Sequence, residues 1–177
     1  MSKLYSKYTT IYMCGKELKV RTHIYNDDRS KKTLLMTHGY LMSAVYFAFI
    51  LPALSEHYRI VMVDNLAWGL NTRTDYMGDA LSSPEKAEKW LLTWWEKLVE
   101  ALAGDLPEKF YVSGHSAGGY QLMLYACYHP ERIEAMFLQS PSCFIDTTVP
   151  GFVDDIYDNR ISDESSEPAP RWLVTKL

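Results

Sequence analysis

Cysteines, clusters of basic residues and long apolar runs are all scarce in this chain of 177 residues. The three cysteines, Cys14, Cys127 and Cys143, lie far apart and form no C-x-x-C pair, which excludes the spacing of a disulfide framework or a zinc site. The carboxylates of segment 154–164 match no calcium loop. No dense group of lysines and arginines offsets the formal charge of −4, so nucleic acid is not expected as a partner. We expect no metal and no cofactor.

Segments that direct a protein to a membrane are also missing from the sequence. The N-terminus lacks the apolar core of a signal peptide, and the longest apolar run, residues 41–54, is interrupted and too short to cross a bilayer. We therefore expect a cytoplasmic protein, with peripheral attachment to a membrane as a further expectation. The hydrophobic fraction of 47%, with 14% aromatic residues, predicts one domain with a packed core.

Short β-branched runs alternate with helical patterns along the chain. Such alternation predicts an α/β fold with a mostly parallel sheet and helices on both faces. The first two strands read as an antiparallel hairpin at a sheet edge. Strands are expected at residues 9–13, 17–25, 33–37, 58–63, 109–112 and 135–139, and helices at 44–55 (mostly buried), 82–103 (capped by Ser82 or Ser83) and 120–128.

The chain is organised around Gly114-His115-Ser116-Ala117-Gly118, which joins an apolar run to a helical one. A serine hydroxyl attacks a carbonyl when it is exposed, aimed and backed by a base, and a strained strand-to-helix turn supplies the exposure and the aim. Gly114 and Gly118 leave room for that turn. Ser116 is thus the predicted nucleophile, and the His115 side chain should point away from it and pack. The alternative is an ordinary turn of small residues.

A second motif, His38-Gly39-Tyr40, stands at the expected end of strand 33–37. The oxyanion of a tetrahedral intermediate needs at least two preorganised N–H donors. We expect these donors to be the backbone N–H groups of Ala117 and Tyr40, with Gly39 allowing the chain to turn and His38 holding the loop by hydrogen bonds. An ordinary strand-end turn is the alternative.

Together these motifs resemble the α/β-hydrolase fold-1 family over residues 9–141, with Asp64 and Gly69 retained from its motif after the fourth strand. The tryptophan-bearing segment 88–98 is similar to the branch that contains N-acyl-phosphatidylethanolamine lipase and the lipid-droplet lipase coactivator. The resemblance implies a serine esterase or lipase that acts on a small-molecule or lipid carboxylic ester. It also implies peripheral association with a membrane or lipid droplet.

The family completes its catalytic triad with an acid and a histidine that follow the strained turn at its serine, the nucleophile elbow, whereas no histidine follows His129 in this sequence. Residues 1–141 are accordingly expected to form the N-terminal part of a hydrolase core that lacks its last strands. Residues 142–177 are expected to begin a lid or a disordered tail, in a C-terminally truncated chain. Asp146 is a candidate for the triad acid.

None of the five histidines is expected to act as the base. His129 is too far along its helix to reach Ser116, and His23 and His57 are expected to be solvated. We therefore expect an esterase or lipase that uses Ser116 and a histidine outside this chain, with weak activity or none on its own. The alternatives are a non-catalytic lipid-binding or lipase-regulating protein, an acyltransferase that uses the same serine, and an inactive fragment.

The sheet order can also be predicted. The strand before Ser116 should lie between the strands that end at His38 and Gln139, because that order puts both N–H donors beside the serine. Strand 135–139 would then be an apolar edge, which natural sheets usually protect. This predicts an aggregation-prone or partner-dependent product.

Overall fold

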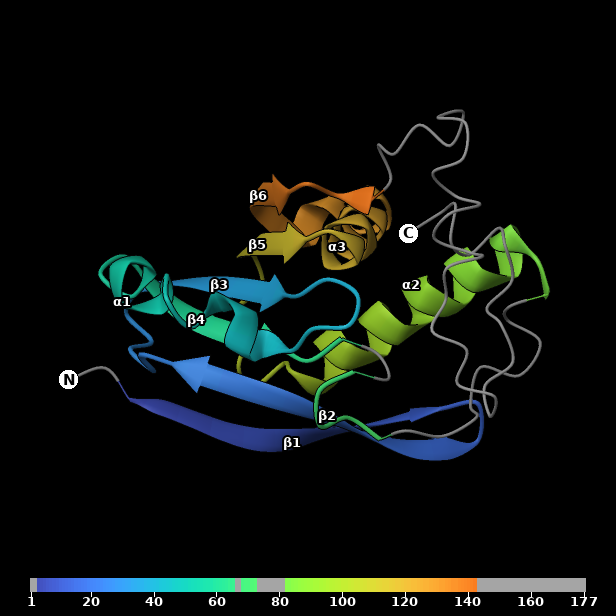
Figure 1. Ribbon diagram of the computed structural model, residues 1–177, viewed down its shortest axis with the longest axis horizontal. Coiled ribbons are helices and arrows are strands. Elements are labelled where there is room, and N and C mark those ends of the chain that lie inside the picture. Colours follow the sequence, from blue (N-terminus) through green and yellow to red (C-terminus); the bar gives the residue numbers. More distant parts are fainter. Residues whose placement is uncertain (1–2, 66–67, 73–81, 143–177) are drawn as a thin grey trace.

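The computed structural model describes residues 3–65, 68–72 and 82–142. They form one six-stranded sheet with the order β1-β2-β4-β3-β5-β6 (Figure 1). The strands are β1 (Leu4–Met13), β2 (Lys16–Tyr25), β3 (Lys32–Thr37), β4 (Tyr58–Val63), β5 (Phe110–His115) and β6 (Ile133–Gln139). The helices are η1 (Ala44–Phe47), α1 (Leu51–Leu54), α2 (Pro84–Ala101), α3 (Ala117–Tyr128) and η3 (Pro130–Arg132). The predicted α/β class is confirmed.

Strands β1 and β2 form the predicted antiparallel hairpin, in register from Leu4 opposite Tyr25 to Met13 opposite Lys16. Its turn places Cys14 and Gly15 at φ 52° and 71°, as a two-residue hairpin loop requires. Strand β2 pairs antiparallel with β4, and β4, β3, β5 and β6 are mutually parallel. The sheet is therefore parallel in its interior and antiparallel at one edge.

The two faces of the sheet carry separate hydrophobic cores. On one face α2 and α3 pack over the sheet, with Trp94, Trp95 and Leu122 fully buried. On the other face η1 and α1 cover β3 and β4 through Phe47 and Leu51. Alternation along the buried strands divides the side chains between these cores, so that Leu35 faces the first and its neighbours Leu34 and Met36 the second.

Helix α2 forms as its sequence predicts. Ser83 adopts the extended conformation of an N-cap and its hydroxyl accepts the Lys86 N–H, while Pro84 occupies the first turn. The Trp95 indole N–H donates to the Gln121 side-chain oxygen at 3.1 Å, which ties α2 to α3. A buried polar contact thus joins α2, which precedes β5, to α3, which follows it.

The single helix expected at residues 44–55 is wrong. Two short pieces, η1 and α1, replace it, and Val45, Phe49 and Ile50 point outward with most or much of their side chains exposed. Pro52 lies in the first turn of α1, where its missing N–H is not needed, rather than near the end of a long helix. The segment is apolar almost throughout, so no stripe of apolar residues beside a polar face marked its buried side. The sequence therefore did not indicate that the segment forms two short pieces.

Strand β5 lies between β3 and β6, as predicted, and β6 is an edge strand of the described sheet. Met136 and Phe137 of β6 are exposed. The predicted lid or tail lies outside the described residues apart from Ser142, and so does Asp146. Within the described part, no helix is both long and apolar enough to cross a membrane.

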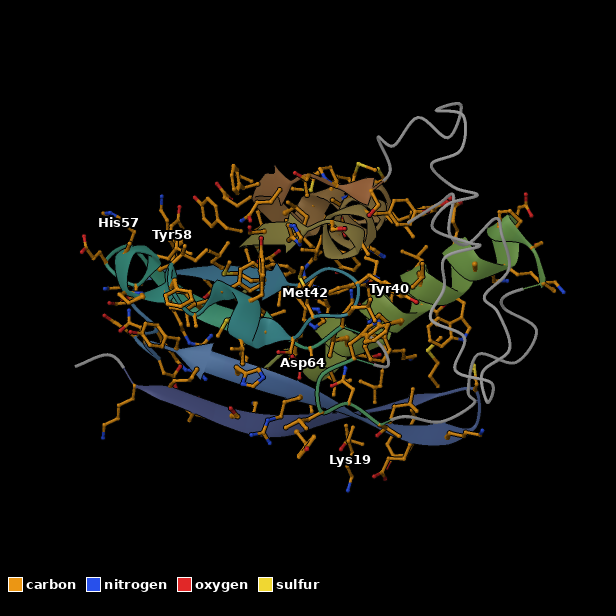
Figure 2. All side chains as sticks on the ribbon, in the orientation of Figure 1. Lys19, Tyr40, Met42, His57, Tyr58 and Asp64 are labelled. Carbon is orange, nitrogen blue, oxygen red and sulfur yellow. The ribbon has the colours of Figure 1, made fainter. Side chains whose placement is uncertain are left out.

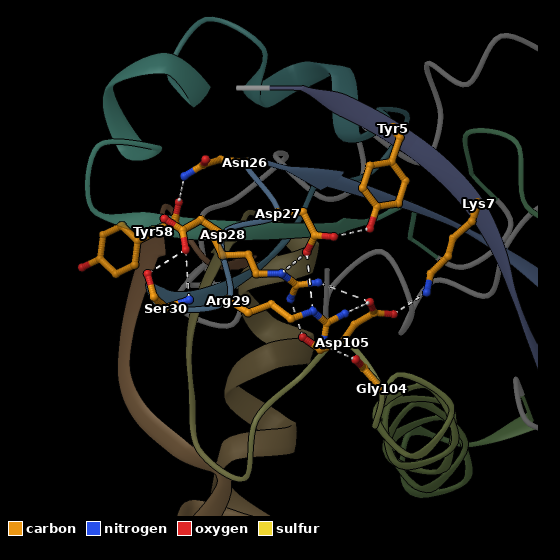
Figure 3. A network of polar contacts seen from close by, with 11 residues as sticks. Tyr5, Lys7, Asn26, Asp27, Asp28, Arg29, Ser30, Tyr58, Gly104 and Asp105 are labelled. Carbon is orange, nitrogen blue, oxygen red and sulfur yellow. Dashed lines mark hydrogen bonds and ion pairs between the residues drawn. The ribbon is translucent and has the colours of Figure 1, made fainter. Parts of the chain in front are cut away.

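A charged network closes the sheet at the amino ends of its parallel strands (Figure 3). Arg59, at the start of β4, is almost completely buried and donates to the Asp27 carboxylate at 2.5 Å and to the Asp105 carboxylate at 3.3 Å. Its guanidinium also donates to the Asp105 carbonyl at 2.5 Å. Lys7 and Arg29 pair with the same Asp105 side chain. The network joins β1, the β2–β3 loop, β4 and the segment before β5.

Candidate active site

Ser116 lies between the end of β5 and the first residue of α3. Its φ of 51° and ψ of −123° fall outside the regions that residues with a side chain normally adopt. Backbone hydrogen bonds hold it there: its N–H donates to the Gln139 carbonyl at 2.9 Å, and its own carbonyl accepts the Tyr120 and Ser142 N–H groups at 3.1 and 3.3 Å. The strained strand-to-helix turn expected at Ser116 is present.

Glycines allow the segments around Ser116 to approach each other closely. A Cβ on Gly114 would lie 2.7 Å from backbone atoms of Gly118 and Gly119. One on Gly118 would overlap the His38 carbonyl and lie 2.8 Å from the Thr37 carbonyl. The predicted room for the turn at Gly114 and Gly118 is confirmed, and the start of α3 packs directly on the end of β3.

Gly39 brings the loop after β3 against the elbow. A Cβ at this position would lie 2.9 Å from the Ser116 Cβ and 2.9 Å from the His115 Nδ1. Tyr40 follows with its side chain about half exposed, and its ring packs edge-on against Trp68 at 4.7 Å between centroids. Ala117 is buried at the first turn of α3. The loop and the elbow are therefore adjacent, while the oxyanion role of the Tyr40 and Ala117 N–H groups stays a prediction.

His38 holds this loop in place, as expected. The ring is fully buried, its Nε2 accepts the Asn65 N–H at 2.8 Å, and its Nδ1 donates to the Gly39 carbonyl at 2.7 Å. Because Nε2 must accept, the ring is the neutral Nδ1–H tautomer. Burial lowers the pKa of His38 below its usual value, although the Gly39 carbonyl and the Asp64 carboxylate act in the opposite direction.

Asp64 has a larger part in the site than the sequence suggested. Its buried carboxylate accepts the Ala44 N–H at 2.8 Å and the Leu70 N–H at 3.1 Å, so it fixes the chain after both β3 and β4. Gly69 is at φ 58°, and a Cβ there would overlap this carboxylate. Figure 2 shows Asp64 below Tyr40 and Met42 in the view, near the carboxyl ends of β3 and β4. Asp64 and Gly69 are the two residues of the family motif that this sequence keeps, and they were the feature of the sequence that could have indicated this role.

The charge of Asp64 is stabilised within the fold. Burial raises the pKa of its carboxyl group, but the nearby His23 ring and the Ala44 and Leu70 N–H groups outweigh burial, so the pKa lies below its ordinary value. The His23 Nε2 is 3.8 Å from the Asp64 Oδ1, and its Nδ1 is 2.7 Å from the Ser6 hydroxyl. The expectation that His23 is solvated is therefore wrong. Strand β2 is not at the edge of the sheet, because it pairs with β1 on one side and β4 on the other.

The remaining histidines have other neighbours. His115 stacks on Tyr46 at 4.6 Å between centroids, and burial lowers its pKa. His129 pairs with Glu96 at 2.9 Å, at the far end of α3, and His57 is exposed as expected. Among the described residues, which include all five histidines, the Ser116 hydroxyl contacts the Ser142 hydroxyl at 3.3 Å and no imidazole.

Ser142 is a neighbour that the sequence did not indicate. Its hydroxyl lies beside the Ser116 hydroxyl, and the residue is 2% exposed. The sequence position of Ser142, just after a strand, does not indicate this contact, because only the fold brings the residue beside Ser116. In the described ranges, His, Cys, Asp and Glu form no group of three or more that could hold a metal ion.

Known proteins share the sequence pattern of this chain. The pattern of the alpha/beta hydrolase fold family matches residues 32–163. A probable 1-acylglycerol-3-phosphate O-acyltransferase of Oryza sativa subsp. japonica is 31% identical over 129 residues, which cover 73% of this chain and 30% of that protein. A pimeloyl-[acyl-carrier protein] methyl ester esterase of Aeromonas hydrophila is 32% identical over 114 residues, which cover 63% of this chain and 39% of that protein.

Solved structures share the fold. A probable hydrolytic enzyme from Pseudomonas aeruginosa PAO1 matches with a TM-score of 0.67 and 21% identity, over 87% of this chain and 48% of that chain. Naproxen esterase from Bacillus subtilis matches with a TM-score of 0.59 and 21% identity, over 78% and 44%. The chain thus spans less than half the length of these relatives and structures. The narrower likeness to one lipase branch stays a prediction. Because the family pattern covers well over half of the 177 residues, the chain belongs to the alpha/beta hydrolase fold family.

Proposed function

We propose that Ser116 is the nucleophile of an acyl-transfer reaction on a carboxylic ester. The observation that carries this proposal is the conformation of Ser116, held at φ 51° where β5 meets α3. Residues at such angles cost about 1–3 kcal/mol, and this cost is typical of functional sites. The side chain is partly accessible and stands in front of the first turn of α3. Attack by its oxygen on the ester carbonyl would give a tetrahedral intermediate.

The negative charge of that intermediate would be held by the backbone N–H groups of Tyr40 and Ala117. Support comes from the close packing of Gly39 on the Ser116 Cβ, which brings the loop after β3 to the elbow. His38 and Asp64 would act as positioning residues, since one fixes the Gly39 carbonyl and the other fixes the Ala44 N–H. Such donors stabilise a transition state only when their positions are fixed beforehand.

The base that accepts the Ser116 proton is proposed to be a histidine outside this chain. In support, every histidine of the sequence is accounted for by another contact or by solvent, and the contact of the Ser116 hydroxyl among described residues is with Ser142. Without a base, rate enhancement would be limited to the roughly 10³–10⁴-fold that an oxyanion hole and binding provide.

Two relatives favour a second candidate, transfer of the acyl group to an alcohol instead of water. The rice protein and a 1-acylglycerol-3-phosphate O-acyltransferase of Arabidopsis thaliana, 30% identical over 125 residues, carry that activity in their names. The same serine would serve both reactions, because only the acceptor in the second half differs. Product analysis with and without 1-acylglycerol 3-phosphate as the acceptor separates them.

The proposal is tested by covalent labelling of the purified chain with a fluorophosphonate, followed by mass spectrometry of its peptides. We expect one adduct, on Ser116, whose formation is accelerated by added imidazole because the free ring supplies the missing base. Ser116→Ala should lose the adduct. Ser113→Ala is the matched control, since the Ser113 hydroxyl is buried without a hydrogen-bond partner among described residues.

Labelling that is absent from Ser116 with and without imidazole would contradict the proposal. It would instead favour the non-catalytic lipid-binding or lipase-regulating alternative. Fast labelling that imidazole does not accelerate would contradict only the assignment of the base to a histidine outside residues 1–177.

A further inference from the structure

Large apolar side chains are exposed along the segment that joins β3 to β4. Phe49 is 97% exposed and Val45 is 72% exposed, and Leu41, Tyr46 and Ile50 are exposed beside them in sequence. We name these five residues the 41–50 surface. Contiguous exposed apolar side chains are uncommon on monomeric proteins and mark sites of interaction with proteins, ligands or membranes.

This surface is presented by an ordered base. Ala44, Phe47 and Leu51 from the same segment are buried in the core over β3 and β4. The Ala44 N–H is fixed by the Asp64 carboxylate at 2.8 Å. The outward direction of Val45 and Phe49 therefore follows from the packing of their neighbours, and their exposure is a property of the fold.

The 41–50 surface adjoins the proposed nucleophile. The Tyr46 ring stacks on His115, the residue before Ser116, at 4.6 Å between centroids and 30° between planes. Gly39, two residues before Leu41, packs against the Ser116 Cβ. In Figure 2 the labelled Tyr40 and Met42 lie at the loop that follows β3, which leads into this segment. Anything that binds to the 41–50 surface would therefore lie beside Ser116.

The charge of this segment indicates which kind of partner fits the 41–50 surface. No Asp, Glu, Lys or Arg occurs from residue 33 to residue 55, although 23% of the chain is charged. The formal charge of −4 gives no general attraction to anionic lipids. Apolar side chains with a tyrosine at the border suit a neutral lipid–water interface, where the aliphatic groups enter the acyl region and the phenol stays at the headgroups.

We infer that the 41–50 surface docks this protein on a neutral lipid surface, beside Ser116. The part of this inference that concerns an ester substrate rests on the proposed function: a lipid ester in the layer would then meet the nucleophile without crossing water. The presence of a lipid, 1-acylglycerol 3-phosphate, in the names of the two plant relatives agrees with this substrate class.

The test measures binding of the purified chain to phosphatidylcholine vesicles by co-sedimentation. We expect Phe49→Glu to weaken binding about tenfold or more, because it removes an apolar side chain from the layer and adds a charge. Tyr128→Glu is the matched control: Tyr128 is also an exposed aromatic residue, at 64%, but it ends α3 on the opposite face of the sheet. Binding by the wild type should persist when the salt concentration is raised.

Other results would overturn the inference. These are no vesicle binding by the wild type, equal losses in the two variants, or a dimer in solution that Phe49→Glu dissociates, which would assign the surface to a second copy. Thermal unfolding checks that each variant folds, and Phe49→Ser replaces Phe49→Glu if it does not. Ser116→Ala should bind vesicles like the wild type. A wild-type chain that binds vesicles but takes no label on Ser116, with or without imidazole, would reject the proposed function and leave this inference standing.

Discussion

The amino and carboxyl ends of the parallel strands are held by different interactions. At the amino ends, Arg59 is buried among Asp27, Asp105 and further charged groups. At the carboxyl ends, Gly39, Gly114 and Gly118 allow backbones to touch around Ser116, and the buried carboxylate of Asp64 accepts backbone N–H groups. One end uses side-chain charges to close the sheet, and the other uses small residues to leave a strained serine accessible.

Stability and reactivity are therefore expected to depend on different ends of the sheet. The network at the amino ends is expected to contribute to the free energy of unfolding without affecting Ser116. The glycine contacts are expected to affect both quantities, because they place Ser116, the proposed nucleophile, and pack α3 on β3. Substitutions at the two ends should reveal that separation.

Replacing Arg59 by methionine should lower the free energy of unfolding by about 3–5 kcal/mol, the range for breaking a buried ion pair from one side. The reason is that Asp105, with a side chain 7% exposed, loses its buried cation and keeps Lys7 and Arg29, whose side chains are 43% and 62% exposed. Denaturant unfolding measures the change. Arg29→Met is the control, because Arg29 is 62% exposed and should cost less than about 1 kcal/mol. Equal costs for both variants would refute the distinction between them.

Gly118→Ala should lower the free energy of unfolding by about 1–3 kcal/mol and also reduce fluorophosphonate labelling of Ser116. The new methyl group would press on the His38 and Thr37 carbonyls, which are backbone atoms that cannot rotate away. Gly104→Ala is the matched control, since nothing lies within 4 Å of a Cβ there. If labelling survives while stability falls, the close packing is structural and does not place the nucleophile.

Ser116→Gly should raise the free energy of unfolding by about 1 kcal/mol, because glycine adopts φ 51° without strain and this gain exceeds its entropic cost. Ser116→Ala keeps the Cβ and should show no such gain, although both variants lose the hydroxyl group. Thermal unfolding of the two proteins makes the comparison. Identical transitions would mean that the turn is not strained.

The carboxyl groups of Asp64 and Asp27, one from each end, should both contribute to the acid sensitivity of the fold. Although burial raises each pKa, hydrogen bonds and ion pairs outweigh it, and both pKa values lie below the ordinary value of about 3.8. The stabilisation is therefore complete above about pH 4 and is lost as the pH falls through the folded pKa. Asp64→Asn and Asp27→Asn should each flatten this acid limb of stability against pH.

The two effects should add in the double variant, because the groups lie at opposite ends of the sheet and share no partner. Urea unfolding at a series of pH values tests this. An unchanged acid limb in both single variants would show that other carboxylates determine it.

Much of the fold could be predicted because its signals are local. The hairpin, the buried strands and the capped helix α2 each follow from polarity patterns or end residues within one short segment. The strained turn at Ser116 was predictable for the same reason, since it is a contiguous motif whose glycines have a steric purpose. Even the position of β5 between β3 and β6 followed from the need to bring two distant motifs together.

The features that the sequence did not predict depend on contacts between segments that are distant in the chain. His23 reads as a residue of a solvated edge, and only the pairing of β2 with both β1 and β4 places it beside Asp64. The 44–55 segment is uniformly apolar, so its sequence does not tell which side chains face the sheet. Ser142 is brought to the Ser116 hydroxyl by the end of β6, and nothing in its neighbours indicates that contact.

The fixed tautomer of His38 offers a way to observe the loop directly. Its Nδ1 proton lies in a 2.7 Å hydrogen bond to the Gly39 carbonyl, and the ring has no exposed surface. A ring proton shielded in this way exchanges slowly with water and gives a separate downfield signal in a proton NMR spectrum. That signal would report whether the loop after β3 is closed, in any variant and without a substrate, and its exchange rate would measure how often the loop opens.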